Sequence, residues 1–538
     1  MAFDPRNPDV ARPTLPDLDS QASTSTIEDG TSSLGIKEGQ QPSLTSQTKE
    51  GDLEIQHTRI PRPQNTLREA LFITVICSSQ LLTQAGLAQS IVPQHVIASS
   101  FDLDKQPSQL SCRHIHPHRW TLGDVFGHKR LFIGGFAWFA VWSAIAGFSV
   151  YSSGPILFDI CRAMQGIGPA FLLPNAIAMI ARTYEPGMRQ NLIFCLFGAT
   201  APGGFVLGAV FTALLAQKAW WPWAYWIMSM ICIACTVLAI VIIPATPPPT
   251  LEDLDEAGKE GRSGLWEQID VLGSLTGLAA LVLFNFAWNQ GPVAGWKPYT
   301  YIILIISVLV FAMFIFVEKR ISTHPLIPFG VLEGGSFFTL ACISAGWSSF
   351  GIFVYYMWNF LEILRHHSIL LISAQITPIA ISGLCAALTT GFILNTFRPS
   401  TVILISMTAF FAGGVVLATM PVGQTYWAQT FIGIIILPWG MDMSFPAATI
   451  ILSRAMPKRH QGLAASLVNT FVNYSISIGL GVAGTVDSQV NQQGMDILGG
   501  YRGALYTGVG LAGMGVVIAL MFCLVDRNRA GEEAESPA

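Results

Sequence analysis

Two charged side chains stand inside long apolar stretches, and they are the first candidates for chemistry in this sequence. Arg162 follows Asp159 by three residues, and Asp442 is flanked by residues 434–441 and 443–446. A charge in such surroundings costs about 2.5–3.5 kcal/mol, so it seldom persists without a role. A carboxyl group with little water around it can exchange a proton. We expect Asp442 to exchange a proton and Arg162 to have a functional role; the alternatives are an Asp159–Arg162 ion pair, and a helix end facing cytoplasmic water for Asp442.

A second group consists of uncharged polar or aromatic side chains within apolar stretches. Small-molecule sites in membrane proteins lie near the middle of the bilayer, among the polar side chains of the spanning helices. For any one of these residues, hydrogen bonding between helices is an equally good explanation. The candidates for substrate binding are Gln84, Gln89, Asn175, Tyr355, Asn359, Gln375, Trp439, Asn469 and Asn473.

One short polar run combines a thiol with three imidazoles, which are groups that bind zinc. It contains Cys112, His114, His116 and His118. We expect no metal here, because the run interrupts an otherwise apolar region. The other eight cysteines lie in apolar stretches, where a thiol packs as a small hydrophobe, so no disulfide framework is predicted. The phosphate-binding G-x-x-x-x-G-K-[ST] motif is absent from the sequence, and we expect neither enzymatic activity nor a cofactor.

The elements that position these residues are membrane-spanning helices. Of 538 residues, 51% are hydrophobic and only 12% are charged, which a water-soluble fold cannot accommodate. A net charge of -4, without a basic patch, argues against a nucleic-acid partner. A span needs about 20 apolar residues. Thirteen runs qualify, near residues 70–98, 131–151, 155–181, 191–216, 222–243, 271–289, 299–317, 337–363, 369–394, 401–420, 426–453, 463–486 and 503–525.

Basic residues are unevenly shared between the loops. From residue 131 onward, alternate loops hold ten Lys and Arg on one side and four on the other. Short cytoplasmic loops are enriched in these residues, so the first set is predicted to be cytoplasmic. The same rule places a disordered tail (1–68), a connector (244–270) and a C-terminal tail (526–538) in the cytoplasm.

One region conflicts with this alternation. Arg59, Arg62 and Arg68 precede the first run, and Lys129 and Arg130 precede the second, so both runs should begin in the cytoplasm. One crossing cannot satisfy both signals, and residues 111–120 are too few and too polar to return across the bilayer. We therefore predict that one span is missing between them, through an altered reading frame, a retained intron or a faulty gene assembly.

Three motifs resemble those of the major facilitator superfamily. Residues 122–130 (LGDVFGHKR) resemble its loop between the second and third helices, including Asp124, Gly127 and Arg130. Residues 162–168 (RAMQGIG) resemble its fourth helix, in which a buried guanidinium is tied to proton coupling. Residues 198–208 (GATAPGGFVLG) resemble its antiporter element, which marks exporters. Its small and kinking residues here are Gly198, Pro202, Gly203, Gly204 and Gly208.

The remaining motifs resemble the fungal branch of the fourteen-span drug:proton antiporters, which includes aminotriazole-resistance transporters. They include Trp220–Trp223, Asp270–Gly273, Pro325–Pro328 and Pro438–Asp442. The resemblance implies an all-α fold of two six-helix bundles plus two extra helices. The N-terminal bundle would be residues 69–243, the extra spans 271–317 and the C-terminal bundle 318–525.

The function implied by this resemblance is proton-coupled export of a small molecule by alternating access. Asp124, Arg130, Arg162 and Asp442 would couple proton movement. The expected partners are substrate, protons and lipid, with a monomeric chain in the plasma membrane or, alternatively, the vacuolar membrane. The second interpretation is a membrane protein that does not transport, either a sensor or a defective product of a damaged gene, which the missing span favours.

Overall fold

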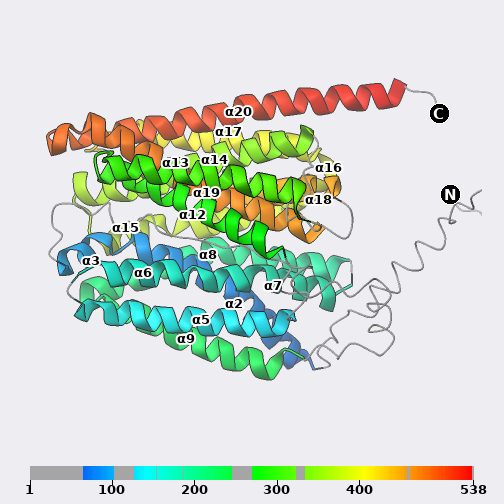
Figure 1. Cartoon of the computed structure of the whole chain (residues 1–538), viewed down its shortest axis with the longest axis horizontal. Coiled ribbons are helices and arrows are strands. Elements are labelled where there is room, and N and C mark those ends of the chain that lie inside the picture. Colours follow the sequence, from blue (N-terminus) through cyan, green and yellow to red (C-terminus); the bar gives the residue numbers. More distant parts are fainter. Residues whose placement is uncertain are drawn as a thin grey trace, which may run out of the picture. The chain divides into compact units, whose positions relative to one another are not determined.

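The computed structural model describes residues 65–101, 127–152, 154–185, 187–244, 270–322, 334–456 and 461–535. Thirteen helical segments in this part are long and apolar enough to span a membrane, which confirms the predicted fold class (Figure 1). The elements are α2 (Thr66–Ile91), α3 (Gln94–Ser100), α5 (His128–Phe148), η2 (Ser149–Tyr151), α6 (Ile156–Gln165), α7 (Ile167–Thr183), α8 (Met188–Lys218), α9 (Pro222–Ile242), α12 (Val271–Val293), α13 (Pro298–Arg320), α14 (Gly334–Asn359), η3 (Phe360–Leu364), α15 (Ile369–Ile376), α16 (Pro378–Thr396), α17 (Pro399–Ala418), α18 (Gln429–Ala455), α19 (Gln461–Val490), η5 (Gln492–Gly494) and α20 (Ile497–Glu535).

Three of the predicted spans are each built from two α-helices, and the one near residues 70–98 comprises α2 and α3. The span at 155–181 breaks at Gly166 into α6 and α7, and the span at 369–394 breaks at Thr377 into α15 and α16. Pro378 follows the second break, where its missing N–H is tolerated at the start of a helix. The last helix also continues to Glu535, well beyond residue 525 where the sequence pattern ends its apolar run. Apolar composition predicts where a chain can cross a bilayer but not where its helix stops.

The first half of the protein comprises α2, α3 and α5–α9. Helix α2 packs along α8, and α5 lies against α6, α7 and α9. Its main core is a cluster of buried apolar side chains from these helices, with Phe72, Phe132, Phe136 and Leu172 fully buried. This half positions Arg162 and the glycines of α8.

The second half comprises α14 to α20. Helix α17 packs against α18 and α20, and α14 packs against α19 and α20. Two apolar clusters fill this half, one around Met407 and Phe410 and one around Ile343 and Trp347. Asp442 lies near the middle of α18 in this half.

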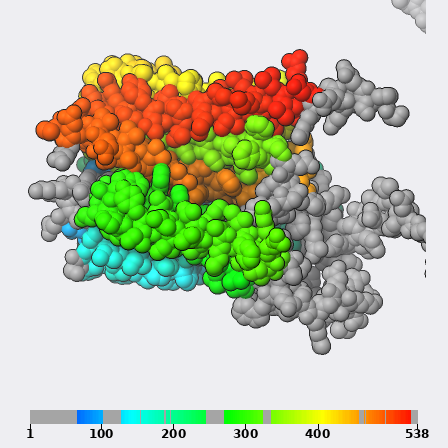
Figure 2. Space-filling model, turned by 45° about the horizontal axis from the view of Figure 1, so that its top comes forward, coloured from blue at the N-terminus to red at the C-terminus, as the bar shows by residue number. Residues whose placement is uncertain are grey.

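The extra pair, α12 and α13, is fastened to α19 by polar contacts. The Asn289 amide donates to Ser477 Oγ at 2.9 Å, and Ser477 Oγ bonds to Asn285 Oδ1 at 2.5 Å. The Trp288 indole donates to the Ile478 carbonyl at 3.1 Å. Many apolar side chains of α13 are exposed, as expected for a lipid-facing helix, and the pair is visible as the green ridge in Figure 2.

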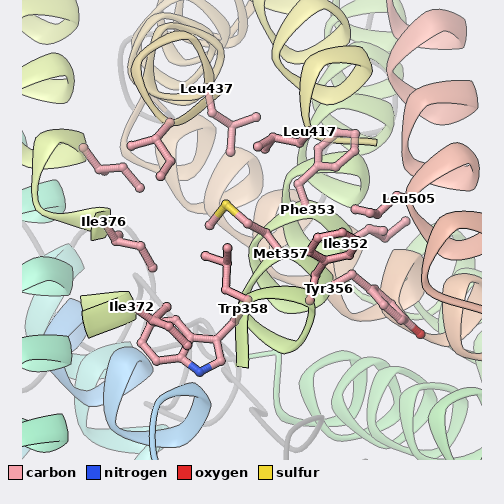
Figure 3. Close-up of a cluster of buried hydrophobic side chains, with 14 of the residues drawn as sticks. Ile352, Phe353, Tyr356, Met357, Trp358, Ile372, Ile376, Leu417, Leu437 and Leu505 are labelled. Atoms are coloured by element: carbon pink, nitrogen blue, oxygen red, sulfur yellow. The ribbon is translucent and has the colours of Figure 1, made fainter. Parts of the chain in front are cut away.

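The two halves share one cluster of buried apolar side chains. Figure 3 shows members of this cluster from the second half. Ala88, Val206 and Ala209 of the first half contribute to it, together with Phe353 and Trp358 of the second. Helix α8 also packs along α15 and α16, and Ser373 Oγ donates to the Ala209 carbonyl at 3.3 Å. The junction between the halves therefore runs along α8, α15 and α16.

Helices α2 and α5 begin at the same end of the first half. Arg68 Nη2 donates to the Val241 carbonyl at 3.4 Å, and Lys129 Nζ donates to the Ile243 carbonyl at 2.5 Å, so both helix starts lie at the C-terminal end of α9. Phe101, which follows α3, contacts Trp221 at the other end of α9 with a ring distance of 6.3 Å. Two successive long helices thus run in the same direction, in agreement with the charge pattern. The predicted missing span, between residues 110 and 122, lies outside the described residues.

We call the end that carries Arg68 and Lys129 the basic end. In the second half, Arg398 precedes α17 and Arg454 lies in the last turn of α18. Arg398 donates to the Asp526 carbonyl and Arg454 lines the same small cavity as Asp526, so both arginines lie at one end of this half. Helices α8 and α16 run antiparallel at the junction, so the basic ends of both halves coincide.

Candidate functional site

Arg162 is the centre of a buried network that joins four helices. Its Nη2 donates to the Gly86 carbonyl at 2.8 Å and to Ser90 Oγ on α2, and its Nη1 donates to Gln165 Oε1 on its own helix. The guanidinium carbon lies 5.6 Å from the ring centre of Tyr225 on α9, a cation–π contact. Only 5% of Arg162 is exposed. These contacts hold the guanidinium inside the helix bundle.

Neighbouring polar groups extend this network. Gln165 Nε2 donates to Ser143 Oγ on α5 at 2.6 Å, and the Tyr225 hydroxyl donates to the Gln89 carbonyl at 2.9 Å. Gln89 itself, a predicted substrate contact, donates to the Ala224 carbonyl at 3.0 Å, and its Oε1 is buried and meets no hydrogen-bond partner within the described ranges. Gln84 is half-buried on the same helix. The structure brings Gln89 and Arg162 together, a grouping that their separation in the sequence does not reveal.

Asp442 lies at the junction between the halves. Its Oδ2 is buried and has no hydrogen-bond partner in the part of the chain that the structure describes. A methyl group built on Gly383 of α16 would meet Asp442 Oδ2 at 2.8 Å and the Pro202 ring at 2.9 Å. The carboxylate and the proline of the antiporter element therefore face each other across the bare backbone of Gly383. The alternative of a helix-end residue facing water does not fit this position, eleven residues or more from either end of α18.

The glycines of the α8 element divide into two kinds. A methyl group on Gly208 would meet Ala85 Cα at 2.5 Å, and one on Gly204 would meet the Leu81 backbone, with Leu81 Cα at 2.8 Å. These two glycines, four residues apart, let α8 approach α2 at backbone distance, as small residues do between membrane helices. Gly198 and Gly203 have open space at the corresponding position.

The loop motif is only partly within the described residues. Gly127 has φ +85°, a conformation that L side chains rarely adopt and that glycine allows just before α5. Lys129 donates to the Ile240 and Ile243 carbonyls and so satisfies the C-terminal end of α9. Arg130 is exposed at the start of α5. Asp124 lies outside the described residues, as do Cys112, His114, His116 and His118.

The other predicted substrate contacts are spread along the protein. Asn175 is buried, with Oδ1 2.7 Å from His128 Nδ1 near the basic end. Trp439 packs against the apolar cluster around Phe410, and Asn473 donates to Asn469 on the same helix. Their participation in substrate binding stays a prediction.

Three predicted contacts lie at the end opposite the basic loops. The carbonyl of Tyr355 accepts the Asn359 amide at 2.9 Å. Gln375 Oε1 lies 3.2 Å from His367 Nδ1, and the Gln375 carbonyl accepts the Tyr426 hydroxyl at 2.6 Å. Asn359 is the last residue of α14, and Gln375 contacts His367, which precedes α15. These positions therefore lie closer to helix ends than mid-membrane contacts would.

Two polar contacts were not among the sequence-based candidates. Both carboxylate oxygens of Glu69 accept from Arg189 Nη2 at 2.8 Å, which joins the starts of α2 and α8. His95 Nε2 lies 3.7 Å from Glu362 Oε2, joining α3 to η3. Both pairs stand near the boundaries of apolar runs, where charged residues are ordinary, so the sequence carried no signal that would single them out.

In the part of the chain that the structure describes, five spans in the first half, six in the second and the extra pair, with polar side chains at buried helix contacts, define a polytopic membrane protein. The sequence profile of the Major Facilitator Superfamily matches residues 121–480 and 336–538. The chain belongs to this superfamily. A crystal structure of a POT family transporter aligns with a TM-score of 0.56 at 12% identity, covering 87% of this chain and 98% of that one, which supports the fold.

Several fungal relatives share most of their length with this chain. A low affinity ammonium transporter of Saccharomyces cerevisiae is 54% identical over 86% of this chain and 90% of its own length. An efflux pump of Aspergillus terreus is 43% identical over 88% and 91%, respectively. The aminotriazole resistance protein of Saccharomyces cerevisiae is 36% identical over 88% and 86%. The predicted resemblance to the fungal aminotriazole-resistance branch is confirmed.

Proposed function

We propose that this transporter exports a small molecule in exchange for protons, by alternating access of a central site to the two sides of the membrane. The observation that carries the proposal is the position of Asp442. Its carboxylate is buried, its Oδ2 has no hydrogen-bond partner among the described residues, and it faces Pro202 of the antiporter-like element across Gly383. A carboxylate at the junction of two moving halves can gain water in one conformation and lose it in the other.

The efflux direction is supported by the relatives that are named as an efflux pump and a resistance protein. Arg162 supports proton coupling differently. Its fixed positive charge is buried beside Gln89 and Tyr225 and stabilises the hydrogen-bond network around it. A proton or a substrate can enter this network only by displacing one of its bonds. Asp124 and Arg130 remain candidates through the loop motif alone.

The test is Asp442→Asn, which keeps the shape and removes the charge. The assay uses inside-out vesicles with an acidic interior. In these vesicles the parental chain should accumulate a drug such as aminotriazole against its concentration gradient. We expect the variant to lose this uphill accumulation while it retains exchange of labelled for unlabelled drug, which needs no net proton movement. Asp496→Asn is the matched control, because Asp496 is an exposed carboxylate in the same half.

Two results would count against the proposal. Uphill accumulation at the parental rate by Asp442→Asn would remove Asp442 from the coupling step. Loss of both accumulation and exchange, with normal folding, would make Asp442 a substrate-binding residue instead.

A second candidate function is transport of ammonium, because the relative that carries this name is 54% identical to the chain. Growth of an ammonium-uptake-deficient yeast on limiting ammonium distinguishes the two candidates. Rescue of growth without any drug resistance would favour ammonium transport, and resistance without rescue would favour export.

A further inference from the structure

A polar cluster joins the two halves at the end opposite the basic loops. Helix α3 of the first half supplies Gln94 and His95, and the end of α14 with η3 in the second half supplies Asn359 and Glu362. Gln94 Nε2 lies 3.0 Å from Asn359 Oδ1, and His95 Nε2 lies 3.1 Å from the same oxygen. His95 Nε2 also lies 3.7 Å from Glu362 Oε2. The contacting residues are about 265 positions apart in the chain, so they are contacts between halves.

The direction of each bond in this cluster can be worked out. Asn359 Nδ2 donates to the Tyr355 carbonyl at 2.9 Å, which fixes the orientation of its amide. Asn359 Oδ1 is therefore an acceptor, and His95 must carry a proton on Nε2 to bond to it. Glu362 Oε2 accepts the Trp358 indole N–H at 3.2 Å. The first half supplies the donors and the second half supplies the acceptors.

Two of the four residues are buried, whereas the side chains of His95 and Glu362 are 24% and 17% exposed, and the cluster stands beside the apolar cluster that the halves share. Gln94 is 1% exposed and Asn359 is 3% exposed. Val92, two residues before Gln94, is fully buried in the shared cluster with Trp358. The backbone at Glu362 is π-helical over Phe360–Leu364, a form that is often found at functional sites.

We propose that Gln94, His95, Asn359 and Glu362 form the gate that closes the transport path at this end. The proposal rests on alternating access, which requires that the halves separate here when the path opens to this side. Polar contacts suit such a gate. When the halves part, water replaces each protein hydrogen bond, so the net free-energy difference per bond is small and the gate can open repeatedly. The apolar contacts around Val92 exclude water while the gate is closed.

The experiment measures whether water-borne reagent reaches Val92. The full-length chain, with its nine cysteines replaced by alanine, carries Val92→Cys as the reporter. A membrane-impermeant maleimide is applied to either side of sealed vesicles. Asn359→Leu removes the shared acceptor and leaves the Gln94 and His95 donors without a partner in the closed form. We expect reporter labelling from the side opposite the basic loops to rise about tenfold, which corresponds to about 1.4 kcal/mol.

Ser229→Ala is the matched control, because Ser229 is also buried and donates to the Ala140 carbonyl within the first half alone. Labelling should stay at the parental rate in this variant. An equal rise in Ser229→Ala and Asn359→Leu would mean general loosening and would overturn the gate. Unchanged labelling in both Asn359→Leu and the double variant Gln94→Leu, Asn359→Leu would also overturn it.

A crosslink gives a second measurement that does not depend on a destabilising substitution. His95→Cys and Glu362→Cys are joined by a short bifunctional thiol reagent that is cleaved by reductant. A further single cysteine in the transport path, on the membrane-interior side of the gate, serves as the reporter. We expect its labelling by the maleimide to fall on crosslinking and to recover on reduction. Because labelling needs no substrate, a gate that behaves as described while drug export is absent would refute only the proposed function. Normal export with the crosslink in place would refute only the gate.

Discussion

Arg162→Met separates a role in transport from a role in folding. The substitution keeps much of the side-chain volume and removes three hydrogen bonds and a cation–π contact. Hydrogen bonds between membrane helices contribute about 0.6 and at most about 1.7 kcal/mol each, and the cation–π contact about 1 kcal/mol. The loss is therefore about 3–6 kcal/mol. Removing the charge also removes the free-energy cost of a charged residue in a membrane span, which is about 2.5–3.5 kcal/mol.

The difference leaves a net destabilisation of about 0–3 kcal/mol, which a folded membrane protein can tolerate. We expect the purified variant to elute as a single species and to melt within about 10 °C of the parental chain. Drug accumulation in inside-out vesicles should nevertheless fall to background. Arg162→Lys, which keeps the charge without the planar fork, should restore part of it. Lys218→Met is the surface control, because Lys218 is exposed.

Two results would refute this reasoning. If Arg162→Met transports at the parental rate, the guanidinium has no part in coupling. If the variant and Arg162→Lys both fail to fold, the network around Gly86 and Ser90 is structural, and the bond energies used above are too small.

Three further predictions concern the helix contacts and the missing span. Gly204→Ala should lower the melting temperature and weaken transport, because its methyl group would meet the Leu81 backbone, whereas Gly203→Ala should be neutral or stabilising; thermal unfolding of both variants compares them directly. Ser477→Ala should loosen the helix pair α12 and α13 from α19 and raise its proteolysis in detergent; unchanged proteolysis would show that the Trp288 and Tyr474 bonds hold the pair without Ser477. Sequencing of the mature transcript across codons 105–125 should reveal about 20 additional apolar codons; a transcript that matches the printed chain should instead accompany weak or absent drug efflux in a pump-deficient yeast.

Much of the fold could be predicted, because apolar run length and loop charge act locally. The thirteen spans follow from composition, and the shared direction of α2 and α5 follows from Arg68 and Lys129. Helix breaks at Gly166 and Thr377 were not predicted, since apolar residues continue on both sides of each. Glycine and proline spacing in α8 predicted close approach, but tertiary packing decides that Gly204 contacts α2 while its neighbour Gly203 does not.

The candidate site, too, could be predicted only in part from the sequence. The buried charges Arg162 and Asp442 were visible in the sequence, because a charge within an apolar run is costly wherever it points. Their partners were not visible, since Gly86 and Gly383 present only backbone atoms or bare space. Asn359 was expected near a substrate, yet its oxygen accepts bonds from α3. A single sequence does not tell which amides join helices and which face a substrate.

The bonds between α12 and α19 determine which parts of the protein should move as one body. With Asn289 and Trp288 anchored to α19, the extra pair is expected to follow the second half in every conformation. A fluorescent pair on α13 and α20 would then report a constant distance during turnover, whereas one on α13 and α9 would report the rocking itself. The extra helices enlarge the lipid-contacting surface of the second half only. The two halves should therefore displace unequal volumes of bilayer as they tilt. Transport by this protein should therefore respond to membrane thickness and lateral pressure more strongly than transport by a symmetric pair of bundles.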